Sequence, residues 1–145
     1  QAAQALGRSR GGFGTKVHLA AADERTAVAV ELTAGQCHDA PVFDALWDQA
    51  RPRLGAVDEG AADRSYDSDH VRGRLIDDDV SPVIPNRSNR LDPWPFDPEA
   101  YRERNRVERL VGHLKQYRRV ATRYDKLRCT FLAFVHLALV VIRLT

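Results

Sequence analysis

The chain has 145 residues, of which 43% are hydrophobic and 29% are charged, and this suits one globular domain with a real core. The two cysteines, Cys37 and Cys129, stand far apart and exclude a disulfide framework or a cysteine-rich metal site. No signal peptide is visible, and the most apolar run, residues 131–142, is shorter than the roughly 20 residues of a membrane span. We therefore expect a cytoplasmic protein without a membrane partner.

Charge is unevenly distributed along the chain, although the formal net charge is only +2. Residues 101–128 contain ten Lys or Arg against three Asp or Glu, a net charge of +7. Residues 57–79 contain eight acidic residues against three Arg, a net charge of −5. A basic last third favours an anionic partner on one face, but solvated Arg-rich helices explain the same pattern equally well.

The first part of the chain predicts a β-hairpin. Residues 6–14 are polar and rich in Gly and Arg, and we expect a loop there. Residues 15–22 and 26–33 have the alternation and β-branched content of two antiparallel strands. Because the chain opens on Gln1 and not Met, we expect it to be truncated or to begin in a downstream reading frame.

The remainder predicts alternating helices and strands. Asp39 and Pro41 are typical of a helix start, Asp67 with Ser68 of another, and Asp97 with Pro98 of a third. The expected elements are a helix to residue 50, a strand at 56–62, a helix at 69–78, a strand at 80–84, a loop at 86–95, a helix from 97 to about 118, and a helix at 126–144. This order predicts an α/β fold, a ribonuclease H-like mixed sheet with flanking helices that lacks its first strand.

One segment of the third helix combines polar groups in a regular pattern. Tyr101, Arg104, Glu108 and Lys115 stand at offsets 0, 3, 7 and 14. On an α-helix they share a stripe roughly 60° wide, beside the apolar face. An ordinary ion pair between Arg104 and Glu108 is the simpler interpretation of the same residues.

A second acidic residue stands just past a predicted strand end, in residues 62–68 (ADRSYDS). Strand ends are where α/β sheets place their ligands, which favours Asp63 as a functional carboxylate. Asp63 could also be a turn or helix-cap residue, but Asp67 fits the cap better and leaves Asp63 free.

These two segments, 45 residues apart from Asp63 to Glu108, resemble the DDE transposases of bacterial insertion sequences, specifically the insertion-sequence-five type group. That group carries its second catalytic Asp in A-D-x-G/A-Y-D-S and its catalytic Glu in Y-x2-R-x3-E-x6-K. Further similar segments are ALGRSRGGFGTKVHL, LTAGQCHDA, VIPNRSNR, RRVATRYDKL and FLAFVHLAL. Ser65 replaces the usual Gly or Ala of the Asp motif.

The resemblance implies a polynucleotidyl transferase that cuts and joins DNA with three carboxylates and Mg²⁺ or Mn²⁺. Asp63 would be the second carboxylate and Glu108 the third, and both would bind metal. The first belongs on a strand ahead of the hairpin, and neither Asp23 nor Asp39 has that context. Residues 1–145 would therefore be a partial catalytic domain, without the N-terminal strand and DNA-binding region, and inactive as this fragment alone.

The resemblance also implies DNA as the partner, both the terminal repeats of the element and its target. Arg104 and Lys115 would contact phosphate, and Tyr101 would stack on a base or orient Glu108. Arg118, Arg119 and Arg123 would make non-specific backbone contacts. We expect a homodimer in the transposition complex, associated with the bacterial nucleoid.

Two other functions stay open. A non-catalytic DNA-binding or dimerising remnant fits the missing acid, and a ribonuclease H-like nuclease would hydrolyse DNA without joining strands. The five histidines, His18, His38, His70, His113 and His136, lack metal-ligand spacing, and we expect structural roles for them.

Overall fold

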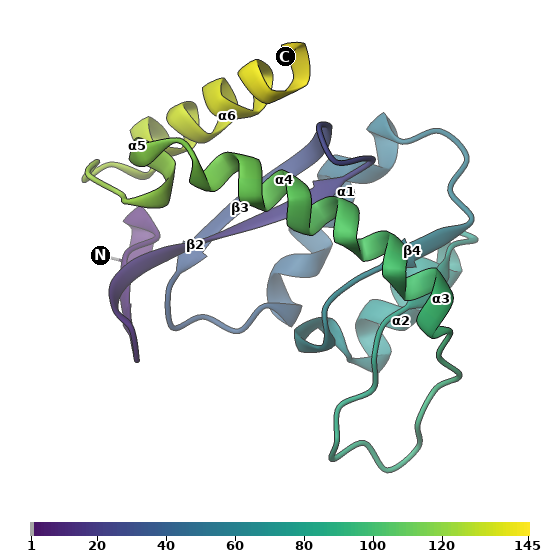
Figure 1. Ribbon diagram of the computed structural model, residues 1–145. Coiled ribbons are helices and arrows are strands. Elements are labelled where there is room, and N and C mark those ends of the chain that lie inside the picture. Colours follow the sequence, from purple (N-terminus) through teal and green to yellow (C-terminus); the bar gives the residue numbers. More distant parts are fainter. Residues whose placement is uncertain (1) are drawn as a thin grey trace.

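A computed structural model describes residues 2–145 (Figure 1). The strands in this part of the chain form two separate sheets: β1 (Gly7–Ser9), β2 (Gly12–Ala21) and β3 (Ala27–Ala34) in one, and β4 (Glu59–Ala61) and β5 (Ser81–Val83) in the other. The helices are α1 (Phe43–Ala50), α2 (Asp69–Asp77), α3 (Pro98–Tyr101), α4 (Asn105–Lys115), α5 (Arg118–Ala121) and α6 (Arg128–Leu144). The predicted α/β class is confirmed, but the strands of residues 2–145 form an antiparallel sheet and a separate parallel sheet instead of the one mixed sheet that was expected.

The larger sheet is an antiparallel meander in the order β1-β2-β3. β2 pairs with β3 over seven residue pairs, with Val17 opposite Leu32 and Leu19 opposite Val30, and a register shift follows Ala20. The connection is closed by the Asp23 side chain, which accepts hydrogen bonds from the backbone N–H of Arg25 and the hydroxyl of Thr26. The predicted hairpin is therefore confirmed.

The smaller sheet joins β4 to β5 in parallel, with α2 as the crossover between them. Gly60 on β4 sits where a Cβ would lie 3.2 Å from side-chain atoms of both Leu75 and Val80. That separation is tighter than nearly all real Cβ contacts, so glycine lets α2 and the start of β5 close onto β4.

Helices cover both faces of the larger sheet. On one face, Val30 and Leu32 of β3 pack against α4, which crosses the front of the molecule in Figure 1, and against α6, which lies along the top of that view. On the other face, Ala29 packs with Phe43, Trp47 and other apolar residues of α1 and α2. This alternation along β3 buries both sides of the sheet and fixes α4 across it.

Three local expectations were wrong. Residues 6–14 are not all loop, because Gly7–Ser9 form β1 and Gly12 already belongs to β2. Asp39 does not cap a helix; its carboxylate bonds the Lys16 ammonium instead. The helix expected from residue 97 to about 118 is interrupted by the 3₁₀ turn η5 (Arg102–Arg104) and ends at Lys115, before the separate short helix α5.

No helix within residues 2–145 is both long enough and apolar enough to cross a membrane.

Candidate catalytic carboxylates

Asp63 follows the C-terminal end of β4, as the sequence predicts. Its backbone is extended, with φ −67° and ψ 157°, and its carboxylate accepts a hydrogen bond of 3.1 Å from the N–H of Ser65. Asp63 thereby caps the short 3₁₀ turn η4 (Arg64–Tyr66). Because Oδ1 makes the capping bond, Oδ2 remains for other partners.

Glu108 lies in the first turn of α4, on the exposed side of the helix. The approach to α4 is held by Asp97, whose side chain accepts hydrogen bonds from the N–H groups of Glu99 and Ala100, with Pro98 at the first helical position. Leu110 and Leu114 of α4 are buried against the sheet. These anchors set the direction in which Glu108 points.

Arg104 joins the two carboxylates. Its Nη2 donates to Oδ2 of Asp63 at 2.9 Å, and its Nη1 donates to Oε1 of Glu108. The two carboxylate oxygens are therefore no farther apart than one guanidinium and two hydrogen bonds allow, roughly 8 Å. The structure thus brings Asp63 and Glu108 together across 45 residues of sequence.

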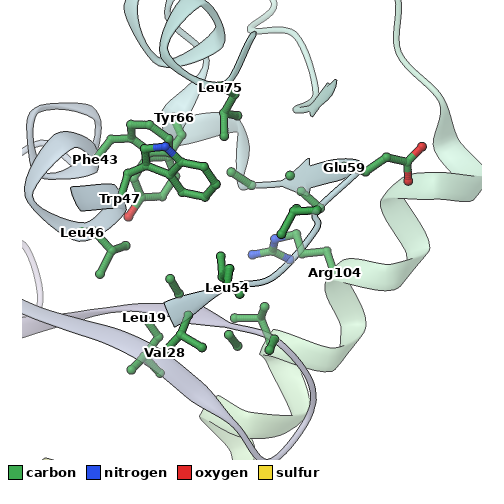
Figure 2. Close-up of a pocket in the computed structure, with 18 of the residues that line it drawn as sticks. Leu19, Val28, Phe43, Leu46, Trp47, Leu54, Glu59, Tyr66, Leu75 and Arg104 are labelled. Carbon is green, nitrogen blue, oxygen red and sulfur yellow. The ribbon is translucent and has the colours of Figure 1, made fainter. Parts of the chain in front are cut away.

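The pair is open to solvent, with side-chain exposures of 49% for Asp63 and 58% for Glu108, whereas Arg104 is 23% exposed. Figure 2 shows Arg104 reaching from its helix into the neighbouring pocket. Tyr101 lies beside this group, with the Arg104 guanidinium 5.8 Å from its ring centroid. Burial raises the pKa of Tyr101, Arg104 opposes that shift, and the charges of Asp63 and Glu108 add to it, so the phenol is neutral.

Behind Asp63, His18 is buried between two hydroxyl groups. Its Nδ1 lies 2.9 Å from the Tyr66 hydroxyl and its Nε2 lies 2.8 Å from Oγ1 of Thr33. Burial is the main cause that lowers the pKa of His18. Burial also raises the pKa of Tyr66, and the charges of Asp39 and Asp63 act in the same direction. This neutral network links β2 and β3 to the turn after Asp63.

The donor set fits part of a magnesium site. Asp63 and Glu108 offer hard carboxylate oxygens of the kind that Mg²⁺ prefers, on the two sides of the Arg104 guanidinium. Across residues 2–145, however, no three His, Cys, Asp or Glu side chains are grouped so that they could hold a metal ion. The described residues therefore bring two carboxylates near each other but do not form a complete metal site.

Comparisons with known proteins agree on the class. Two families, each described as a transposase DDE domain, match the chain, one over residues 61–145 and the other over residues 3–93. A protein of Brucella ovis named "Putative transposase for insertion sequence element IS6501" is 30% identical over 125 residues, which cover 86% of this chain and 93% of that protein.

The chain belongs to the DDE transposases of insertion sequences. No solved structure matches it.

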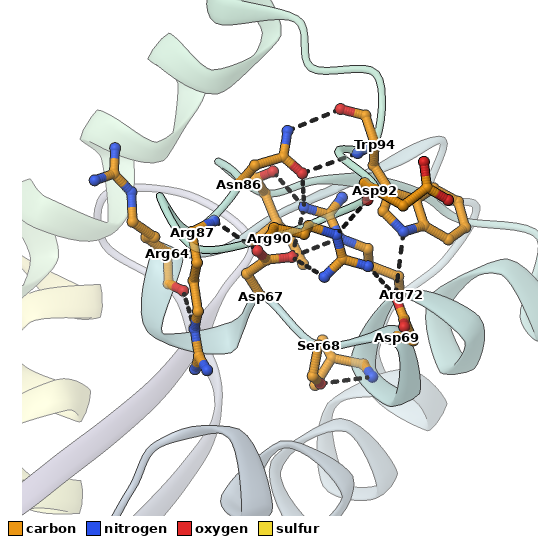
Figure 3. A network of polar contacts seen from close by, with 12 residues as sticks. Arg64, Asp67, Ser68, Asp69, Arg72, Asn86, Arg87, Arg90, Asp92 and Trp94 are labelled. Carbon is orange, nitrogen blue, oxygen red and sulfur yellow. Dashed lines mark hydrogen bonds and ion pairs between the residues drawn. The ribbon is translucent and has the colours of Figure 1, made fainter.

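The sequence alone missed a buried ionic cluster in this transposase (Figure 3). Asp67 does not cap α2, because Ser68 does so by accepting a hydrogen bond from the N–H of Val71. The Asp67 side chain is instead fully buried beside the equally buried Arg72, with Nη2 and Oδ1 2.9 Å apart. Arg90 adds a second ion pair to Asp67 at 3.0 Å.

The Asp67 cluster holds the turn that follows Asp63. The backbone N–H of Arg87 donates to Oδ2 of Asp67 at 2.7 Å, and the Arg87 guanidinium donates to the carbonyl of Ser65 at 2.7 Å. The long loop between β5 and α3 is thus tied to η4, whose cap is Asp63. In the sequence, the loop after β5 is polar and Arg72 is one Arg within a predicted helix. Neither feature indicates that Asp67 and Arg72 are buried.

The expected DNA-contacting residues of the transposase differ in their surroundings. Lys115 is exposed at the end of α4. Arg118 donates to the Tyr124 hydroxyl, and Arg119 lies 4.2 Å above the Phe134 ring. Arg123 bonds the chain itself: the Thr15 hydroxyl and four backbone carbonyls, those of Gln4, Ala5, Asp125 and Lys126.

We expect Asp67→Asn to lower the free energy of unfolding by about 3–5 kcal/mol, because it leaves the Arg72 charge buried and unpaired. The matched control is Asp92→Asn, a change at an exposed carboxylate in the loop between β5 and α3, which should cost little. Chemical denaturation measures both. A loss below about 1 kcal/mol in Asp67→Asn would contradict the structural role of the cluster.

The lowered pKa of Asp67 also predicts that the fold loses stability at low pH. Burial disfavours the charged form of Asp67, but hydrogen bonds from Arg87 and Arg72 and the charges of Arg72 and Arg90 outweigh it and lower its pKa. The stabilisation that ionised Asp67 gives to the fold is therefore complete above its unfolded pKa of about 3.9. It is lost as the pH falls through the lower pKa that Asp67 has in the folded chain. Unfolding followed against pH should show this loss in the native chain.

Proposed function

We propose that Asp63 and Glu108 are the second and third carboxylates of a ribonuclease H-like transposase active site that cleaves and joins DNA with Mg²⁺ or Mn²⁺. The observation that carries the proposal is their convergence on the Arg104 guanidinium. Two acids far apart in sequence meet at a strand end, which is where α/β sheets place ligands. Membership in the DDE transposases supports the same assignment.

The residues of the chain have distinct roles in this proposal. Asp63 and Glu108 present oxygens toward one point and would hold the metal there. When bound, the metal would supply an activated water or DNA 3′-OH and stabilise the leaving oxygen during phosphodiester hydrolysis and strand transfer. The buried Asp67 cluster keeps η4, and with it Asp63, in a fixed position.

Arg104 is the cation that the two acids share in this structure. A guanidinium can bind phosphate as it binds carboxylate, with two parallel N–H groups. We propose that Arg104 gives up the carboxylates when metal and DNA arrive, and then contacts a phosphate near the scissile bond. Tyr101 stays beside it as a neutral phenol, available to stack on a base or to orient Glu108.

The proposed DNA-binding surface begins at Arg104 and continues along α4 and α5. There, the DNA backbone would contact Lys115, Arg118 and Arg119. Arg123 is left out of this surface because its guanidinium is bound within the fold. The substrate would be the terminal repeats and the target DNA, bound by a homodimer at the nucleoid.

A non-catalytic DNA-binding remnant is the second candidate, because residues 2–145 do not group a third acid with these two. β1 has the sequence Gly-Arg-Ser and carries no carboxylate. Complete catalysis in this proposal needs an acid from outside the described residues.

We expect Glu108→Gln to abolish excision of the complete insertion sequence in a cellular excision assay, because an amide replaces a metal-binding carboxylate. Glu103→Gln is the matched control, since Glu103 lies in η5 and pairs only with Arg106 among the described side chains. Normal excision with Glu108→Gln would rule out the proposed site. Loss of excision in both variants would point to the helix and not to the carboxylate.

Arg104→Ala should make Mn²⁺ bind about five- to tenfold more tightly to the purified chain, because a positive charge no longer competes for the two acids. Arg102→Ala, which removes an exposed cation paired with Glu99, should leave the affinity unchanged. Water-proton relaxation measures Mn²⁺ binding directly. Weaker binding in Arg104→Ala would show that the guanidinium orients the acids for the metal and does not compete with it.

Lys115→Ala should weaken binding to duplex DNA and reduce the slope of log affinity against log salt by about 1, the value for one phosphate contact. Arg74→Ala removes the same charge from α2, where Arg74 is paired with Asp48, and should leave the slope unchanged. Fluorescence anisotropy at several salt concentrations measures both slopes. An unchanged slope in Lys115→Ala would remove Lys115 from the DNA surface.

A further inference from the structure

A pocket of about 460 Å³ lies between the start of β3 and the C-terminal half of α6. We call it the β3–α6 pocket. Figure 1 shows the last turns of α6 beside the turn that joins β2 to β3, which is the region of this pocket. Its volume is in the range of ligand sites, roughly 300–1,000 Å³. Asp63, Arg104 and Glu108 do not line it, so it is separate from the candidate catalytic carboxylates.

The floor of the β3–α6 pocket is aliphatic. Val28 and Val30 contribute from β3, and Leu139, Val140 and Leu144 contribute from α6. Val140 is 53% exposed and Leu144 is 80% exposed, so water covers much of their apolar surface in the chain alone. An apolar side chain that docked there would displace this water, which favours binding.

The rim of the same pocket is cationic. Arg25 comes from the turn between β2 and β3, Arg53 from the 3₁₀ turn η3 (Arg51–Arg53), and Arg143 from the last turn of α6. No acidic residue lines the pocket. Within residues 2–145 none of these three guanidinium groups forms an ion pair with a carboxylate. Three segments of the chain therefore bring positive charge to one pocket without a counter-charge.

The fold itself places part of this rim. Arg53 donates from Nη1 to the carbonyl of Val28 at 2.7 Å, which holds its guanidinium beside β3 and leaves its other N–H groups for a ligand. Asp23 lies in the turn next to Arg25, but its two oxygens accept the backbone N–H of Arg25 and the hydroxyl of Thr26. That carboxylate closes the turn and leaves the Arg25 guanidinium without an acidic partner.

We propose that the β3–α6 pocket binds an acidic peptide segment of another protein. An apolar side chain of the segment enters the aliphatic floor, and the Asp or Glu residues beside it pair with Arg25, Arg53 and Arg143. The aliphatic floor decides between a peptide and DNA. A DNA backbone supplies negative charge but offers no apolar side chain to fill the floor.

Fluorescence anisotropy of a labelled peptide tests this docking without metal or DNA, so its result is independent of the proposed catalysis. The probe is the peptide Asp-Glu-Asp-Leu-Phe-Asp-Glu. The matched peptide, Asp-Glu-Asp-Ser-Ser-Asp-Glu, keeps the charge and lacks the apolar anchor. We expect the purified chain to bind the Leu-Phe peptide at least about tenfold more tightly, because only that peptide buries apolar surface in the pocket.

A pair of double variants locates the bound peptide. Arg25→Ala with Arg143→Ala should weaken binding of the Leu-Phe peptide at least about fivefold, because two cations that pair with its acidic residues are lost. The matched control is Arg8→Ala with Arg10→Ala, which removes the same charge from exposed positions in β1 and in the β1–β2 turn, outside the pocket. It should change the affinity less than about twofold.

Absence of binding, or equal binding of the two peptides, would overturn the proposal, because the aliphatic floor would then have no part in recognition. Equal loss in the two double variants would also overturn it, by showing a response to net charge alone. Sedimentation of the chain without peptide tests the other occupant. Self-association that is lost in the Arg25 and Arg143 double variant would mean that a second copy fills the pocket, and the proposal would be wrong.

Discussion

The site depends on the burial of one face of α4 against the larger sheet. Leu110 is fully inaccessible and Leu114 nearly so, and both pack with β3 and α6. Once these two residues are buried, the helix can neither rotate nor slide without exposing them to water. The directions of Arg104 and Glu108, which precede Leu110 by six and two positions, follow from that anchor.

Once α4 is anchored, ion pairing decides how Arg104, Asp63 and Glu108 are arranged. Asp63 and Glu108 would repel each other if brought together alone, but Arg104 stands between them with one N–H for each. The three groups are partly exposed, so solvent weakens their attraction and leaves the arrangement exchangeable. Asp63 and Glu108 can therefore exchange the Arg104 guanidinium for another cation.

Asp63 and Asp67 show how environment separates two acids of the same motif. Asp63 is about half exposed and bonds one backbone N–H and one guanidinium. Asp67 is fully buried and is held by Arg72, Arg90 and the Arg87 backbone. The first is free to exchange partners, whereas the second is fixed by charges that cannot leave the interior. The sequence analysis assigned the capping role to Asp67, and the structure gives that role to Ser68 for α2 and to Asp63 for η4.

The sequence by itself determined the β-hairpin, the alternation of helices and strands from α1 to β5, the cap at Asp97 and the resemblance to the family, because periodicity, capping residues and motif spacing are local properties of the chain. It also placed Asp63 at a strand end. It did not reveal β1 or the breaks on either side of α4. Only the tertiary structure decided that Asp63 and Glu108 share Arg104, that Arg123 bonds the N-terminal segment, and that Arg72 is buried. It also decided that β2 and β4 lie apart with a cavity between them. These contacts join residues dozens of positions apart, and no local pattern encodes which long side chain reaches which partner once the layers have packed.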